Sequence, residues 1–176
     1  TKYLGGHHDL LAGVVAGRSE ILDAVFSHRT LLGGILDPFQ AFLLQRGLKT
    51  VALRVERQAA TAQVLAEWLV DRPGVAEVLY PGLATHPGHW VHTGGEAGAR
   101  AFSEALTEVS LAASLGGTET LVTLPSTTTH YHLSPEQRAT AGIQPGLVRL
   151  AIGLEDAALL QADLSQALTS SSAELS

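Results

Sequence analysis

The longest uninterrupted helical pattern in the chain is the feature that most restricts its fold. Asp37 and Pro38 form a helix start, because an Asp side chain accepts hydrogen bonds from the first turn and Pro suits the first helical position. Pro73-Gly74 marks the end. Between them Arg54 lies off an apolar stripe that recurs every three or four positions, at Val51, Ala52, Val55, Ala59, Ala62, Ala66 and Leu69. The pattern predicts one long helix, of the kind that bridges two layers or two domains.

The segments on either side of this helix predict a mixed α/β chain. Upstream, residues 9–15 (DLLAGVV) have the length and composition of a buried strand, and residues 18–32 show a helical stripe. From Thr169 the Ser-rich tail is expected to fray, and residues 81–94 hold little that could cross a core. Short strands are expected at 75–80, 111–115, 120–124 and 147–152, and helices at 96–106, 134–142 and 156–168.

Composition indicates a globular protein and excludes several classes of partner. The 176 residues are 45% hydrophobic and 16% charged, with a formal net charge of -6. A negative chain is not expected to bind nucleic acid or an acidic membrane surface, and no apolar run is long enough for a bilayer span. Because cysteine is absent, disulfides and thiolate sites are excluded, and the cytoplasm is the expected compartment. The chain has no Met and opens on Thr1, so we expect it to be part of a longer polypeptide.

Histidines and glycine clusters give two weaker functional patterns. The pair His130 and His132 would place both imidazoles on one face of a strand, as in some metal sites, but no third ligand follows at a defined spacing. We therefore expect no metal site. The glycines at 5–6 and 116–117 match neither dinucleotide-binding nor P-loop patterns, and glycines of this kind usually mark turns.

Five motifs resemble, in order, those of the Cys/Met-metabolism family of pyridoxal-phosphate (PLP) enzymes. The segment TKYLGGHHD at residues 1–9 is similar to the family's S-x-T-K-Y-[LI]-x-G-H-S-D, with His8 where the family usually has Ser. The other four are DPFQAFLLQRGLKT from Asp37, SLGGTETL from Ser114, PSTTTH from Pro125 and GLVRLAIGLED from Gly146. Together they cover nearly the whole chain.

The resemblance implies specific roles for five residues. Lys2 would hold PLP through an imine and then act as the base, while the Thr1 hydroxyl would bind the phosphate. Arg149 would clamp the substrate carboxylate with its planar fork, assisted by Ser114 at the carboxylate and by Thr129, which would brace the arginine.

The residues themselves leave alternatives to these roles. Arg149 could instead form an internal salt bridge with Glu119 or Glu155, and either hydroxyl could serve only as a turn or strand cap. The family takes the rest of its active site from sequence upstream of the lysine and partly from a neighbouring subunit. Around residues 89–91 this chain is shorter than the family by about a strand and a loop.

The resemblance also implies a fold and a reaction. The expected fold is the C-terminal portion of a fold type I, aspartate-aminotransferase-like subunit. Residues 1–60 would end the large PLP-binding domain and 61–176 would form the small α/β domain of a homotetramer with shared active sites. The expected function is PLP-dependent γ- or β-elimination or replacement on cystathionine or homoserine-derived amino acids.

Several rivals to this function stay open. One is a methionine γ-lyase, another is an O-acyl-homoserine sulfhydrylase, and a third is a non-catalytic fragment that acts only in oligomerisation. The residue before Ser114 faces the substrate side chain in this family, and here it is Ala113, which cannot pair with a distal ammonium. The SLGG turn, in contrast, is closer to the cystathionine synthases and lyases.

Overall fold

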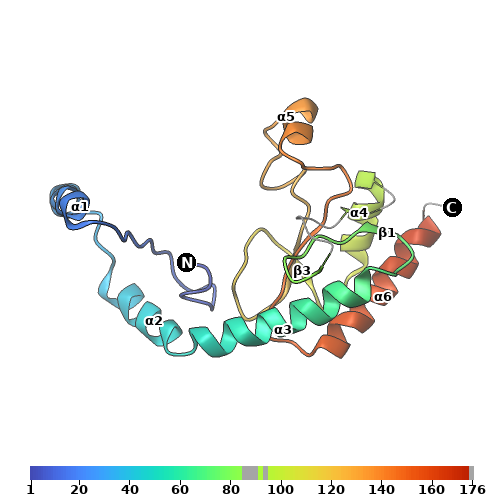
Figure 1. Ribbon diagram of the computed structural model, residues 1–176, viewed down its shortest axis with the longest axis horizontal. Helices are drawn as coiled ribbons and strands as arrows, with labels where there is room; N and C mark the ends of the chain where they lie inside the picture. Colours follow the sequence, from blue (N-terminus) through green and yellow to red (C-terminus); the bar gives the residue numbers. More distant parts are fainter. Residues whose placement is uncertain (85–90, 93–94, 175–176) are drawn as a thin grey trace.

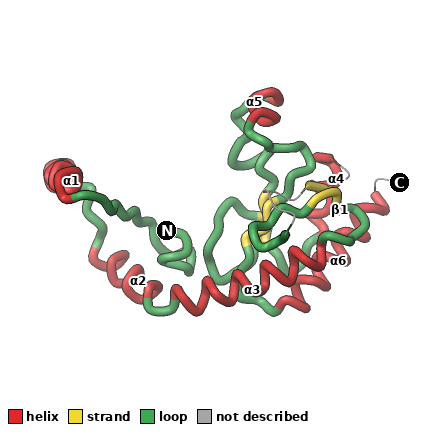
Figure 2. The backbone as a smooth tube through the Cα atoms, viewed as in Figure 1, coloured by secondary structure: helices red, strands yellow, loops and turns green. Residues whose placement is uncertain are grey.

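The computed structural model describes residues 1–84, 91–92 and 95–174 as a mixture of helices and short strands (Figure 1). Loops connect strands of only two or three residues (Figure 2). The elements are α1 (Ser19–Leu32), α2 (Pro38–Leu48), α3 (Val51–Leu69), β1 (Val75–Glu77), β2 (Val91–His92), α4 (Gly95–Ala105), β3 (Ser110–Leu111), β4 (Leu121–Thr123), α5 (Pro135–Thr140), β5 (Arg149–Ala151) and α6 (Ala157–Glu174).

A three-stranded sheet lies at the centre of the C-terminal half, in the order β3-β4-β5. β3 runs parallel to β4, and β4 runs antiparallel to β5 with Thr123 opposite Arg149. β1 and β2 form a separate antiparallel pair. The four strands expected after residue 74 all have counterparts, β1, β3, β4 and β5, although each is shorter than its apolar run.

The hydrophobic core joins this sheet to three helices. α4 packs on α6, and α3 contacts α6 along part of its length. Phe102 is fully buried between them, and the expected inward residues Leu160 and Leu164 are buried too. The remaining members of the cluster are Leu65, Leu69, Ala99, Val109, Val122, Leu124, Val148, Ala167 and Leu168.

The expected single long helix is wrong, because α2 and α3 are separated by a turn at Lys49–Thr50. Asp37 does cap α2 as predicted, accepting from the backbone N–H groups of Phe39 and Gln40. The helical pattern predicts that Arg54 lies off the apolar face, yet Arg54 is only 4% exposed. Its guanidinium donates to the carbonyl oxygens of Gly47 (2.9 Å) and Tyr3 (3.0 Å) and to the Thr50 hydroxyl (3.1 Å). These bonds stabilise the turn between the two helices.

The N-terminal 36 residues differ most from expectation. Residues 9–15 are not a strand, and Leu11 and Val14 are 75% and 76% exposed. A strand needs a partner ladder, and none of the strands within the described ranges pairs with this segment. α1 forms as predicted, but its apolar stripe is uncovered, with Phe26 59% exposed. α1 lies at the far end from α4 and α6 (Figure 1).

Two further expectations concern the C-terminal half. The tail was expected to fray from Thr169, but α6 continues to Glu174. Hydroxyl groups bond back into the helix there, from Thr169 to Ser165 O and from the buried Ser171 to Leu168 O. The poorly fitting region lies mainly at 85–90 and 93–94, outside the described residues.

Candidate active site

A tight N-terminal turn holds Lys2 at the surface. The backbone N–H of Gly6 donates to Lys2 O at 2.7 Å, and Arg54 binds the carbonyl of Tyr3. Leu10 is buried below the turn. The segment that carries the lysine is therefore anchored on the junction of α2 and α3, while the Lys2 side chain is exposed.

The turn at Ser114–Gly117 lies against this lysine segment. Gln58 of α3 donates to Gly117 O at 2.6 Å and fixes the turn from below. A Cβ at Gly117 would overlap the His8 ring. The ring therefore occupies the space that a side chain at position 117 would need. Segments about 110 residues apart in the sequence thus form one polar site.

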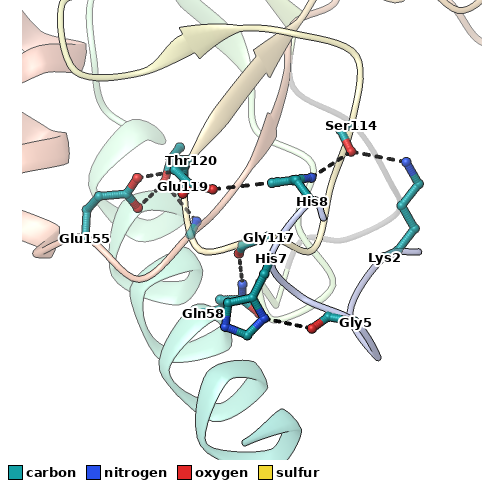
Figure 3. Close-up of polar contacts among 11 residues, drawn as sticks. Lys2, Gly5, His7, His8, Gln58, Ser114, Gly117, Glu119, Thr120 and Glu155 are labelled. Carbon is teal, nitrogen blue, oxygen red and sulfur yellow. Dashed lines mark hydrogen bonds and ion pairs between the residues drawn. The ribbon is translucent and has the colours of Figure 1, made fainter. Parts of the chain in front are cut away.

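A line of polar contacts joins these two segments (Figure 3). Lys2 Nζ donates to Ser114 Oγ at 3.1 Å, and Ser114 Oγ lies 3.3 Å from His8 Nδ1. His8 Nε2 lies 3.8 Å from a carboxylate oxygen of Glu119. An open pocket of about 410 Å³ adjoins the line, bordered by Thr1, Lys2, His8, Asp9, Leu10, Leu11, Gln40 and Ser114.

Arg149 lies on β5 beside the same turn. Its Nη2 donates to Ser114 O at 2.8 Å and to Thr123 Oγ1 at 3.2 Å, and its Nε is buried with no hydrogen-bond partner. The alternative of an internal salt bridge does not form: Glu155 accepts from the backbone and hydroxyl of Thr120, and Glu119 faces His8. The guanidinium therefore keeps donor capacity for an anionic ligand.

Thr123 was missed from the sequence, and it contacts Arg149 where Thr129 does not. The signal for it was strand register, because Thr123 lies opposite Arg149 in the β4–β5 ladder. The Thr129 hydroxyl instead contacts His130 Nδ1 at 2.8 Å. Thr129 and Arg149 nevertheless border one larger cavity of about 670 Å³. It lies along β5 and α3 and is mostly apolar.

The Thr1 hydroxyl is engaged with the backbone. It donates to Ala12 O at 2.9 Å and accepts from Ala12 N at 2.8 Å. Its only proton is therefore already used within the chain. A contact from Thr1 to a phosphate stays a prediction, and it requires the Thr1–Ala12 bond to open.

The donor set around Lys2 fits PLP. PLP enzymes hold the cofactor through a lysine amine, and here an exposed amine borders an open pocket with a serine hydroxyl beside it. Within the described ranges, no group of three or more His, Cys, Asp or Glu is arranged to hold a metal ion. Nor does any helix in that part of the chain have the length and apolar character to cross a membrane.

Comparison with known proteins identifies the family of this chain. The family described as Cys/Met metabolism PLP-dependent enzyme matches residues 1–169. The chain belongs to this family. The predicted resemblance is thereby confirmed, and with it the dependence of the family on PLP.

Two curated relatives illustrate the range of activities in the family. An L-methionine gamma-lyase of Pseudomonas deceptionensis is 43% identical over 185 residues, which cover 96% of this chain and 46% of that protein. A cystathionine gamma-synthase/O-acetylhomoserine (thiol)-lyase of Bacillus subtilis is 41% identical, covering 96% and 45%. The chain thus spans about half the length of these relatives. The 185 aligned positions exceed the 176 residues of the chain, so the Pseudomonas protein carries residues that this chain lacks.

Solved structures confirm the fold. Cystathionine gamma synthase from Xanthomonas oryzae pv. oryzae, in complex with cystathionine, has a TM-score of 0.91 and 39% identity, covering 98% of this chain and 49% of that one. Cystathione gamma lyase from Micromonospora echinospora has a TM-score of 0.89 and 39% identity, covering 96% and 48%. The chain therefore has the fold of the C-terminal portion of a fold type I PLP enzyme.

Proposed function

We propose that this chain supplies the lysine side of the active site in a PLP-dependent enzyme of sulfur amino-acid metabolism. The reaction would be elimination or replacement at the γ- or β-carbon of cystathionine or a homoserine-derived amino acid. The observation that carries the proposal is the convergence of Lys2 and Arg149 on one turn, through the hydroxyl and the carbonyl of Ser114.

The side chains have complementary tasks in this reaction. When bound, PLP supplies an electron-accepting ring that stabilises negative charge at the substrate α-carbon. Lys2 Nζ takes the α-proton and later moves a proton at the β-carbon as the γ-substituent leaves. Arg149 binds the substrate carboxylate with its free donors, and Ser114 holds the Lys2 amine in reach. Thr1 would contact the phosphate, and Thr129 would border the substrate from the larger cavity.

Methionine γ-elimination is the second candidate, because Ala113 is exposed next to Ser114 and offers only a methyl group. A methyl group cannot pair with the distal ammonium of cystathionine but tolerates an apolar side chain. The names of the relatives support both activities, because two methionine gamma-lyases (43% and 42%) and a cystathionine gamma-synthase/O-acetylhomoserine (thiol)-lyase (41%) have nearly the same sequence identity to this chain. An O-acyl-homoserine sulfhydrylase, a third option, is supported by a relative from Pseudomonas aeruginosa at 40% identity.

The proposal extends to organisation. Residues 1–60 would complete a large PLP-binding domain, with residues 61–176 as the small domain, and the subunits would form a homotetramer that shares active sites. The exposed apolar side chains of residues 11–35 support a covering partner or domain there. The cytoplasm is the proposed compartment, because a chain without cysteine needs no oxidising environment.

Replacing each of the two lysines tests the proposal. The purified full-length protein should show the visible absorbance of bound PLP. Lys2→Ala in that protein should lose this band, and its turnover should fall by at least about a thousandfold. Lys49→Ala is the matched control, because Lys49 is exposed at the C-terminal end of α2, and should retain both. A protein that never binds PLP would instead support the non-catalytic role in oligomerisation.

A further inference from the structure

His8 has an unusual backbone conformation for its residue type. Its φ angle is 56°, and it is the one non-glycine residue with positive φ among those the structure describes. Histidine adopts this left-handed region at a cost that surrounding contacts must offset. The conformation sends the ring across Gly117, where the side chain is 28% exposed.

A neutral imidazole with its proton on Nε2 satisfies every polar contact around the His8 ring. A lysine ammonium can only donate, so Ser114 Oγ accepts from Lys2 and keeps its own proton to donate. The ring atom that faces this hydroxyl is His8 Nδ1, at 3.3 Å. When Nδ1 accepts, the proton of a neutral imidazole lies on Nε2. That atom faces the Glu119 carboxylate at 3.8 Å, which is an acceptor.

We infer that His8 is a positioning residue for Lys2 that acts through Ser114. The His8 ring, whose Nε2 faces Glu119, accepts the Ser114 hydroxyl proton at Nδ1. The lone pairs of Ser114 Oγ are then oriented toward the Lys2 amine. The catalytic meaning of this arrangement rests on the proposed function, because it assigns the reactive amine to Lys2. The geometric claim, that His8 controls how firmly Ser114 holds the amine, does not depend on it.

Lysine labelling in the cofactor-free protein tests the geometric claim. The protein is treated with a limiting amount of an acetylating reagent, and mass spectrometry gives the acetylation of Lys2 relative to Lys49 in the same sample. An amine held by an acceptor reacts more slowly than a free one. Ser114→Ala should therefore raise the Lys2/Lys49 ratio two- to tenfold, the range of one hydrogen bond.

Two substitutions at His8 separate its side chain from its backbone. His8→Gly removes the ring while accepting positive φ, so the turn is preserved, and it should raise the ratio nearly as much as Ser114→Ala. His8→Asn also tolerates positive φ and keeps a polar atom at the place of Nδ1, so it should stay near the wild-type ratio. His7→Gln is the matched control, because His7 Nδ1 contacts only the Gly5 carbonyl, at 2.9 Å, and should leave the ratio unchanged.

The double variant decides whether the effect passes through Ser114. If His8 acts only through that hydroxyl, His8→Gly adds nothing in the Ser114→Ala background. The inference is overturned if Ser114→Ala leaves the ratio unchanged, if His8→Gly alone does so, or if the two effects add. If the labelling pattern is as expected but the protein shows no PLP absorbance, the inference about His8 stands and the proposed function is wrong.

Discussion

Under the proposed function, Ala113 is a position whose side chain would select the substrate. It is exposed immediately before Ser114 and presents no charge. Ala113→Glu should supply a partner for the distal ammonium of cystathionine, raising kcat/KM for cystathionine relative to methionine by roughly ten- to a hundredfold. Steady-state kinetics with both substrates measures this ratio.

The control at this position is Ala113→Gln, which has nearly the same shape without the charge. It should leave the substrate ratio near the wild-type value. If Gln and Glu change the ratio equally, the effect is steric, and position 113 does not recognise the distal group through charge.

Asp163 of α6 is a buried carboxylate that closes the loop before β3. It accepts from the backbone N–H groups of Thr107 (2.8 Å), Glu108 (2.9 Å) and Val109 (3.1 Å), from the Thr107 hydroxyl and from Gln166. Burial alone would raise its pKa, but these hydrogen bonds outweigh burial and lower the pKa of Asp163 below the ordinary 3.8.

The lowered pKa gives the pH dependence a definite sign. The stabilisation by the Asp163 carboxylate is complete at pH values above the ordinary carboxyl pKa, which applies to the unfolded chain. It is lost as the pH falls through the lower pKa of the folded state. Asp163→Asn should therefore lower the free energy of unfolding by roughly 2–4 kcal/mol at neutral pH, and by less in acid. Urea denaturation at neutral and at acid pH measures this. The exposed Asp71→Asn should change it by less than about 0.5 kcal/mol at either pH, and an equal loss in both variants would contradict the assignment.

At the scale of elements, the junction of α2 and α3 depends on Arg54. Arg54→Met removes the donor to the Tyr3 carbonyl and one of the donors to the Gly47 carbonyl, and both bonds come from a buried guanidinium. We expect a loss of about 2–4 kcal/mol in unfolding free energy and weaker PLP binding, because the Lys2 segment loses an anchor. Chemical denaturation and PLP titration measure the two effects.

Arg57→Met is the matched control on the same helix. Arg57 is 49% exposed and its ion pair with Asp156 is 3.9 Å long, so the change should cost less than about 1 kcal/mol. If both variants lose the same stability, the buried hydrogen bonds of Arg54 do not stabilise the junction.

The elements that sequence predicted well are those with local signals. The cap at Asp37 and the capping box at Ser134 depend on residues within one turn, and both are present. The turn at Lys49–Thr50 was not predictable, because it depends on Arg54 reaching a carbonyl 51 residues away, at Tyr3. Residues 9–15 have a strand's composition, but no composition supplies the neighbouring strand that they need.

The site follows the same division. Lys2, Ser114 and Arg149 were proposed from motifs, and the structure brings them together within hydrogen-bond distance of one turn. The contact of Thr123 with Arg149 required the strand register, and the contact of His8 with Ser114 required the close approach of two distant segments. Long-range contacts of this kind are not encoded in any one window of sequence.

At the scale of the whole molecule, the N-terminal third exposes an uncovered apolar surface. Leu31 and Leu32 of α1 are 84% and 81% exposed, and Val14 and Ile35 are also largely open. Monomeric soluble proteins rarely expose so many large apolar side chains in one segment, and larger exposed apolar surfaces mark interfaces. Residues 1–176 expressed alone should therefore self-associate, bind a hydrophobic dye and bind PLP poorly.

Analytical ultracentrifugation distinguishes the outcomes. The fragment should sediment as a mixture of species larger than 18.4 kDa, whereas a protein in which this surface is covered should give one defined oligomer. A fragment that sediments as a single monomer with no dye binding would show that the surface needs no cover.

The contact between His8 and Gly117 restricts the order in which this sequence can change. A side chain at position 117 would occupy the place of the His8 ring, so Gly117→Ala should be harmful while histidine is present and tolerated once position 8 holds a small residue. The two positions are therefore epistatic. In proteins that descend from this sequence, a side chain at position 117 can therefore be gained only after the ring at position 8 has been lost. The two substitutions must occur in that order.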